Sequence, residues 1–86
     1  MKKTKYNEEF YEGKIVGIEI KNRGSVKRLK GEIVSTMEDL GFSDIYFPSY
    51  MVEMKEGLTE IGRFQDCHGR MIQVWEDEMS VFEEVQ

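Results

Sequence analysis

The residue types that most often carry out catalysis are scarce in this chain. Its only cysteine and only histidine are neighbours, Cys67 and His68, in a segment whose Asp-Cys-His-Gly composition predicts a hairpin loop. Adjacent residues on a turn rarely point the same way, as a nucleophile and its base must. They also fall short of a zinc site, which needs three or four ligands at suitable spacing. We therefore expect no catalytic residue, no metal site and no cofactor, and we expect that the protein is not an enzyme.

Two other segments carry residue types that are used in catalysis or phosphate binding. Residues 13–17, GKIVG, lack the Gly-Lys-Ser/Thr ending of a phosphate-binding loop. Glu83 and Glu84 are adjacent carboxylates, and a position on the surface suits them better than general acid–base catalysis. The chain therefore points to binding rather than to reaction chemistry.

Charge is distributed unevenly along the sequence. Residues 1–30 hold nine lysines and arginines against four acids, whereas residues 31–86 hold three against thirteen. Clustered charge steers association with a partner of opposite sign. A predicted anion or nucleic-acid contact consists of Lys21, Arg23, Lys27 and Lys30. A predicted protein contact combines aromatic and acidic residues, namely Tyr46, Phe47, Tyr50, Glu76, Asp77, Glu78, Glu83 and Glu84.

A strand followed by an amphipathic helix is expected to position the basic cluster. Residues 14–21 alternate apolar and polar side chains, as a strand does. In residues 25–41, apolar positions recur at helical spacing, Ser25 is a good N-cap, and Gly41 fits a C-terminal cap. The fold predicted first is therefore α+β, with one main helix packed on a three- or four-stranded, mostly antiparallel sheet.

The same stretch also supports a second interpretation. Gly31 and three β-branched residues are unfavourable in a helix interior. The positions from Leu29 to Met37 also fit a period of two, which predicts a strand. The alternative fold is therefore a small all-β, five-stranded barrel.

The rest of the chain predicts further strands and a short helix. Residues 45–54, 58–65 and 70–75 have strand patterns. Pro48 implies that the first of these strands is an edge strand, is bulged at the proline or begins after it, and a sheet edge at Pro48 could pair two copies. The tail, residues 76–86, is predicted as a short helix, with a strand as the alternative. We expect residues 1–12 to form a partly flexible arm and residues 13–86 to form one compact domain.

Two resemblances to known families cover parts of the chain. Residues 14–57, with Leu40-Gly41-Phe42 and Tyr46-Phe47-Pro48, resemble the first half of the N-terminal domain of NusG-type transcription elongation factors, which implies binding to RNA polymerase. Residues 52–77 are similar to the first motif of Sm-like RNA-binding proteins in the spacing of Gly57, Gly62 and Met71. The positions at which that family has its Asp and Asn are His68 and Ile72, so uridine binding is not carried over.

The composition suggests a cytoplasmic protein without a signal peptide or a membrane span. The function expected is that of a small regulatory or adaptor protein that binds another macromolecule, such as a phage-type inhibitor or a transcription-associated factor. A protein is the expected partner. RNA or DNA, bound through the basic residues around 21–30, is the alternative.

Overall fold

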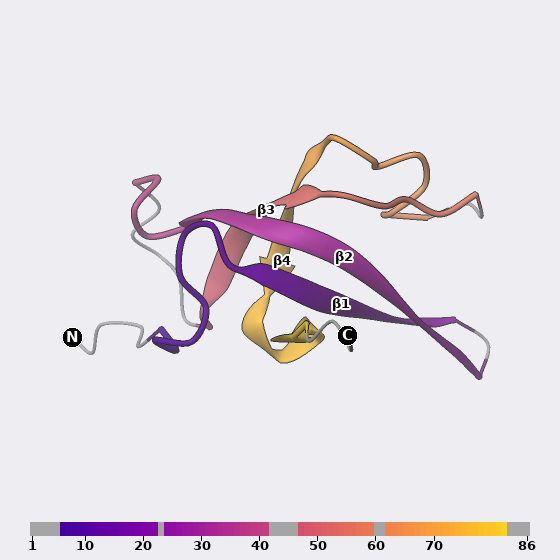
Figure 1. Ribbon diagram of the computed structural model, residues 1–86, viewed down its shortest axis with the longest axis horizontal. Coiled ribbons are helices and arrows are strands. Elements are labelled where there is room, and N and C mark those ends of the chain that lie inside the picture. Colours follow the sequence, from indigo (N-terminus) through magenta and orange to yellow (C-terminus); the bar gives the residue numbers. More distant parts are fainter. Residues whose placement is uncertain (1–5, 23, 42–46, 60–61, 83–86) are drawn as a thin grey trace.

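The computed structural model describes residues 6–22, 24–41, 47–59 and 62–82, and strands dominate it. One antiparallel sheet (Figure 1) contains β1 (Ile15–Asn22), β2 (Ser25–Thr36), β3 (Ser49–Met54), β4 (Met71–Trp75) and β5 (Met79–Val81). In these ranges the single helical piece is a 3₁₀ turn, η1 (Glu76–Glu78). The α+β prediction with a main helix over residues 25–41 is therefore wrong, and the all-β alternative fits. Within the same ranges there is no helix long and apolar enough to cross a membrane.

Residues 25–36 form a strand because the neighbouring strands β1 and β3 offer hydrogen-bond partners for their main chain. Leu29, Gly31 and Ile33 are buried, with less buried residues between them. A spacing of four residues, as between Leu29 and Ile33, fits a helix face and is also an even number, so it fits one face of a strand equally well. β1 pairs with residues 25–32 and β3 pairs with residues 31–36, so each part of the strand has a main-chain partner on at least one side. An extended backbone also suits its β-branched residues.

The segment that resembled a helix end is a turn that follows β2. Leu40 N–H donates to the carbonyl of Met37 at 3.2 Å, and Gly41 N–H donates to that of Glu38 at 3.0 Å. Gly41 has a φ of 97°, a conformation that favours glycine. A left-handed glycine after an apolar residue marks the end of many helices, but here it marks a turn between strands.

The order of strands shows that the sheet is strongly curved. The strands lie in the order β4-β3-β2-β1-β5, so β4 and β5 are at opposite edges. In a flat sheet four interstrand spacings would separate these edges by about 19 Å. Only η1 joins the two strands, and three residues of 3₁₀ helix rise by about 6 Å. The sheet must therefore curl until its edges approach, and η1 lies where they meet.

The concave side of the sheet holds the core. It is completed by residues from outside the strands, because Phe10 and Tyr6 pack edge-on against Tyr50 with ring centroids 5.9 and 5.3 Å apart. The buried cluster consists of Phe10, Val16, Ile18, Leu29, Ile33, Tyr50, Val52, Met54, Phe64, Cys67, Val74 and Met79. Residues 6–14 are thus fastened to the sheet at Tyr50 and contribute to the surface beside η1.

Three local predictions also need correction. β3 lies between β2 and β4, so the prediction of an edge strand at Pro48 is wrong, whereas the alternative that the strand begins after the proline is confirmed. The strand predicted over 58–65 is reduced, in its described part, to an isolated bridge between Leu58 and Gln65, because the chain folds back on itself within the β3–β4 connection. The helix predicted for the tail is one 3₁₀ turn followed by β5, which pairs with β1.

Candidate functional site

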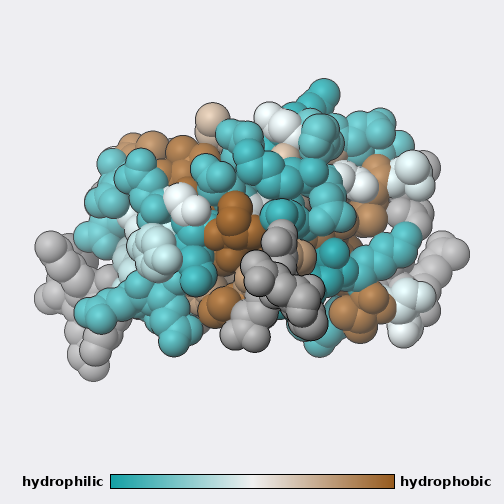
Figure 2. Space-filling model, viewed as in Figure 1, coloured by the Kyte–Doolittle hydropathy of each residue, from teal (hydrophilic) through white to brown (hydrophobic). Residues whose placement is uncertain are grey.

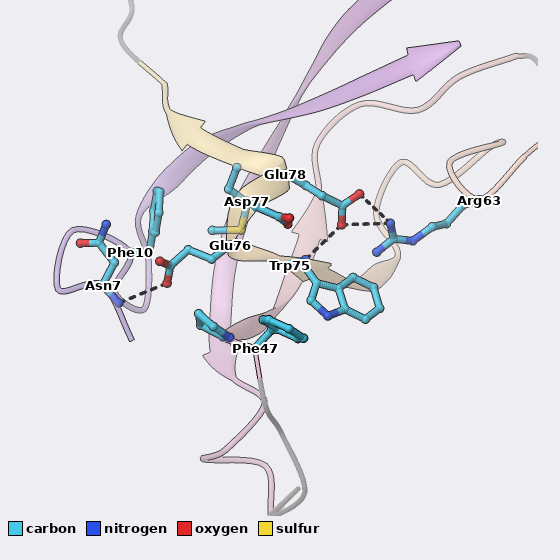
Figure 3. Close-up of a pocket in the computed structure, with 10 residues that line it drawn as sticks. Asn7, Phe10, Phe47, Arg63, Trp75, Glu76, Asp77 and Glu78 are labelled. Atoms are coloured by element: carbon cyan, nitrogen blue, oxygen red, sulfur yellow. Dashed lines mark hydrogen bonds and ion pairs between the residues drawn. The ribbon is translucent and has the colours of Figure 1, made fainter. Parts of the chain in front are cut away.

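The surface beside η1 contains a cleft of about 830 Å³, which we call the η1 cleft (Figure 3). Segments that are distant in sequence form it: the turn before β1, the residues before β3, the β3–β4 connection, and the end of β4 with η1. Its lining consists of Asn7, Phe10, Phe47, Pro48, Arg63, Trp75, Glu76, Asp77, Glu78 and Met79. This volume is typical of clefts that hold a small molecule or a few side chains of a partner.

Exposed aromatic rings distinguish the η1 cleft from the surrounding surface. Phe47 is 71% exposed and Trp75 is 40% exposed, whereas Phe10 and Met79, which also line the cleft, are buried. Hydrophilic residues cover most of the face shown in Figure 2, where hydrophobic residues form separate areas. Aromatic residues that stay in contact with water around a concavity are typical of surfaces that bind another molecule.

Glu76 anchors η1 to the sheet. Its Oε2 accepts a hydrogen bond from the Tyr50 hydroxyl at 2.6 Å and another from the Asn7 main-chain N–H at 3.2 Å. Burial of the phenol raises the pKa of Tyr50, and the Glu76 carboxylate raises it further, so Tyr50 acts as a neutral donor. Tyr50 is fully buried, and it supports the η1 cleft from beneath rather than lining it.

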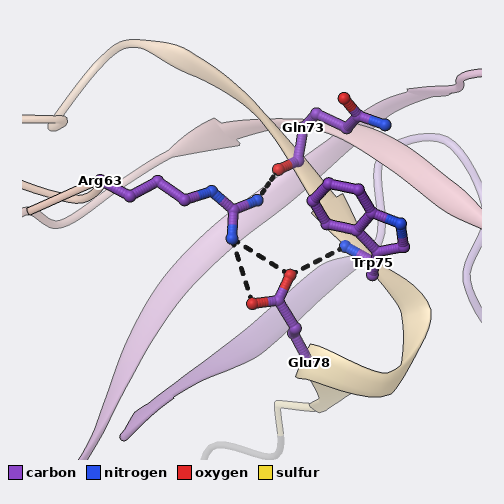
Figure 4. A network of polar contacts seen from close by, with 4 residues as sticks. All are labelled: Arg63, Gln73, Trp75 and Glu78. Atoms are coloured by element: carbon purple, nitrogen blue, oxygen red, sulfur yellow. Dashed lines mark hydrogen bonds and ion pairs between the residues drawn. The ribbon is translucent and has the colours of Figure 1, made fainter. Parts of the chain in front are cut away.

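Arg63 and Glu78 both line the η1 cleft, and they are joined by a network of polar contacts (Figure 4). Arg63 Nη1 lies 3.2 and 3.1 Å from the two carboxylate oxygens of Glu78, and Nη2 donates to the carbonyl of Gln73. Glu78 also accepts a hydrogen bond from the main-chain N–H of Trp75 at 3.1 Å. The guanidinium carbon lies 5.3 Å from the centroid of the Trp75 ring, a cation–π contact. We call Arg63 and Glu78 the clasp.

Asp77 differs from its two acidic neighbours on η1. It is exposed, and its carboxylate has no hydrogen bond or ion pair with another residue in the part of the chain that the structure describes. The three carboxylates of η1 outnumber the single guanidinium of Arg63 by two charges. The η1 cleft therefore combines apolar rings with an excess of negative charge, which suits a partner with apolar and basic side chains.

The predicted protein contact is brought together only in part. Phe47, Glu76, Asp77 and Glu78 line the η1 cleft, and Tyr50 lies beneath it. Tyr46, Glu83 and Glu84 lie outside the described residues. Sequence reasoning missed Trp75 and Arg63 as site residues. The period-two pattern of residues 71–75 could have placed Trp75 on the outer face of its strand, but nothing local connects Arg63 with it.

The basic cluster is divided between the two faces of the β1–β2 hairpin. Because Ile20 is opposite Lys27 and Gly17 is opposite Lys30, the two lysines lie on opposite faces. Lys21 shares the face of Lys30, and Arg23 lies outside the described residues. The grouping expected for a helix is lost because residues three apart share a helix face but not a strand face.

Arg28, which was left out of that cluster, lies on the same face as Lys21 and Lys30. Its Nη2 donates to the Ser80 hydroxyl at 2.8 Å and to the Val81 carbonyl at 2.7 Å, so it fastens β5 to the hairpin. The guanidinium carbon also lies 5.5 Å from the centroid of the Phe82 ring. Arg28 therefore has a structural explanation that does not need a nucleic acid.

The described residues contain no arrangement suited to the catalysis considered above. Cys67 is buried, its thiol donates to the Glu56 carbonyl at 3.3 Å, and His68 is exposed, so the two do not form a nucleophile–base pair. Burial raises the pKa of the Cys67 thiol, which disfavours the reactive thiolate. No group of three potential metal ligands is found among these residues.

Comparisons of the chain with family models, curated proteins and solved structures find no match. The site must therefore be interpreted from its own geometry, and the two resemblances remain untested.

Proposed function

We propose that this is a non-enzymatic binding protein that uses the η1 cleft to hold a segment of another protein. The observation that carries the proposal is that exposed Phe47 and Trp75 share one concavity with the carboxylate of Asp77, which has no partner among the described residues. An apolar side chain of the partner would pack between the rings, and a basic side chain would meet η1. Aromatic anchors surrounded by polar residues supply most of the affinity in many protein interfaces.

The test is affinity capture from a lysate of the native host, with and without nuclease. The baits are the wild type, Phe47→Ser and Asp77→Lys. Phe47 is 71% exposed, so its replacement should leave folding intact. Val26→Ser is the matched control, since Val26 is 61% exposed and lies on the β1–β2 hairpin, away from the η1 cleft.

We expect a nuclease-resistant protein partner that the wild type and Val26→Ser retain and that both cleft variants lose. Loss of an anchor of this kind costs about 2 kcal/mol, or roughly a thirtyfold drop in affinity. Retention of the same partner by Phe47→Ser and Asp77→Lys would show that the η1 cleft is not the binding site.

Nucleic-acid binding is the second candidate, and the register of the hairpin favours it. Lys21, Arg28 and Lys30 lie on one face of β1 and β2, opposite the core. Binding through this face would be sensitive to salt, because bound phosphates release counterions. Electrophoresis with single-stranded RNA and duplex DNA would test it, with Lys21→Glu and Lys30→Glu as variants. A lack of any shift at low salt would exclude this candidate.

A further inference from the structure

β4 is an edge strand of the sheet, and the hydrogen bonds on its inner side show which of its main-chain groups face outward. On its inner side Glu76 N–H donates to the Pro48 carbonyl, and the Arg70 carbonyl accepts from Met54 N–H. Main-chain groups alternate in direction along an antiparallel strand, so those of residues 71, 73 and 75 face outward. The contacts of the clasp agree with this assignment. Arg63 donates to the carbonyl of Gln73, and Glu78 accepts a hydrogen bond from the N–H of Trp75.

This edge has little protection of its own. Most proteins place charged residues, prolines or bulges on edge strands to prevent pairing with other chains. β4, with the sequence MIQVW, has no charged residue and no proline. The clasp covers two of the outward-facing main-chain groups, the carbonyl of Gln73 and the N–H of Trp75. The side chains of Arg63 and Glu78 are themselves 38% and 30% exposed, so water competes with their ion pair. Met71 and Trp75, on one face of the strand, are 59% and 40% exposed.

The sequence around β4 is complementary to itself. Two copies that pair antiparallel about Gln73 would place Met71 of each copy opposite Trp75 of the other. The main-chain groups of Met71 and Trp75 face outward, so the two residues would form a hydrogen-bonded pair across the interface. The same register places Arg70, which precedes the strand, opposite the start of η1, where Glu76 and Asp77 lie. A twofold axis repeats each of these contacts, so opposite charges meet at both ends of the paired β4 strands.

We propose that two copies of this chain form a dimer through the outer edges of their β4 strands, paired antiparallel about Gln73. The clasp opens as the dimer forms. The Gln73 carbonyl and the Trp75 N–H exchange their bonds to Arg63 and Glu78 for main-chain bonds to the second copy. Met71 of the second copy packs on Trp75, as methionine does on aromatic rings, and adds a wall to the η1 cleft. The pairing does not depend on which partner the η1 cleft binds.

Sedimentation equilibrium from micromolar to millimolar protein tests the dimer. We expect a concentration-dependent dimer in the wild type, and at least a tenfold higher dissociation constant for Arg70→Glu, which places two acids opposite each other. Lys21→Glu, the same charge change at an exposed position on the hairpin, should dimerise as the wild type does. Combining Arg70→Glu with Asp77→Arg gives the new glutamate of each copy an arginine beside Glu76 of the other copy, and this should restore the dimer.

The proposal would be overturned by a wild type that stays monomeric at millimolar concentration, by an Arg70→Glu variant that dimerises as the wild type does, or by failure of the combined variant to recover the dimer. Trp75 is the only tryptophan, so its emission gives an independent measure of whether its ring is covered. Dimerisation without any change in that emission would place the interface elsewhere. Phe47→Ser should dimerise normally, which separates a failure of this proposal from a failure of the binding function.

Discussion

The hydrogen bond from Tyr50 to Glu76 is expected to hold η1, and with it the η1 cleft, against the sheet. Tyr50 is fully buried and its hydroxyl lies 2.6 Å from Glu76 Oε2. Tyr50→Phe removes this hydroxyl and keeps the ring that packs against Phe10. A hydrogen bond to a charged acceptor contributes about 1.5–3 kcal/mol to stability. Since 1 kcal/mol shifts the unfolding midpoint of a domain this size by about 4–8 °C, we expect the variant to melt roughly 10 °C lower.

The same bond makes stability depend on pH above 10. Burial and Glu76 raise the pKa of Tyr50 above its ordinary value of 10.0. The contribution of this phenol is therefore complete below pH 10 and is lost as the pH rises towards the folded-state pKa, because the unfolded chain releases the proton first. At pH 11 this release stabilises the unfolded chain by about 1.4 kcal/mol if the folded phenol stays neutral. The gap between wild type and Tyr50→Phe should narrow by that amount from pH 8 to pH 11.

Urea unfolding followed by Trp75 emission at the two pH values measures both effects. Tyr11→Phe is the matched control, because Tyr11 is 57% exposed and its replacement should change the free energy of unfolding very little. A Tyr50→Phe cost below about 0.5 kcal/mol at pH 8, or a cost that is the same at pH 8 and pH 11, would refute this account of how η1 is anchored.

Three further changes have expected outcomes. Gly31→Ala should lower the free energy of unfolding by about 1–3 kcal/mol in urea, because an added Cβ would lie 2.5 Å from a methyl group of buried Val52; an unchanged midpoint would contradict the packing of β2 on β3. Gly17→Ala should cost about 1 kcal/mol, because the three atoms nearest to its new Cβ belong to the side chain of Arg28, which must give up its hydrogen bonds to Ser80 and Val81 to move aside; a larger loss than for Gly31→Ala would show that Arg28 cannot move. Cys67 should react with a thiol reagent only as the protein unfolds, since it is 1% exposed; fast modification in native buffer would show that the β3–β4 connection opens.

Part of the η1 cleft could be predicted from the sequence because it depends on residue type and on exposure. The acids at 76–78 and Phe47 beside Pro48 were selected as contact residues, and both lie at the η1 cleft. Arg63 could not be selected, because its role depends on a turn in the β3–β4 connection that brings it to the carbonyl of Gln73. Tyr50 was grouped with the exposed aromatics, although its position on β3 buries it completely.

The sequence by itself determined the strands over residues 15–22 and 71–75, because alternating side chains and flanking turn residues are local signals. It did not decide the conformation of residues 25–36, where Leu29 and Ile33 fit a helix face and a strand face equally well. Only the tertiary structure decided it. β1 and β3 offer main-chain partners on both sides, and the small size of Gly31 leaves room for Val52 and Ile18 to pack over it. The curling of the sheet then brings its two edges together at η1, and it is this closure, which no local pattern encodes, that creates the η1 cleft.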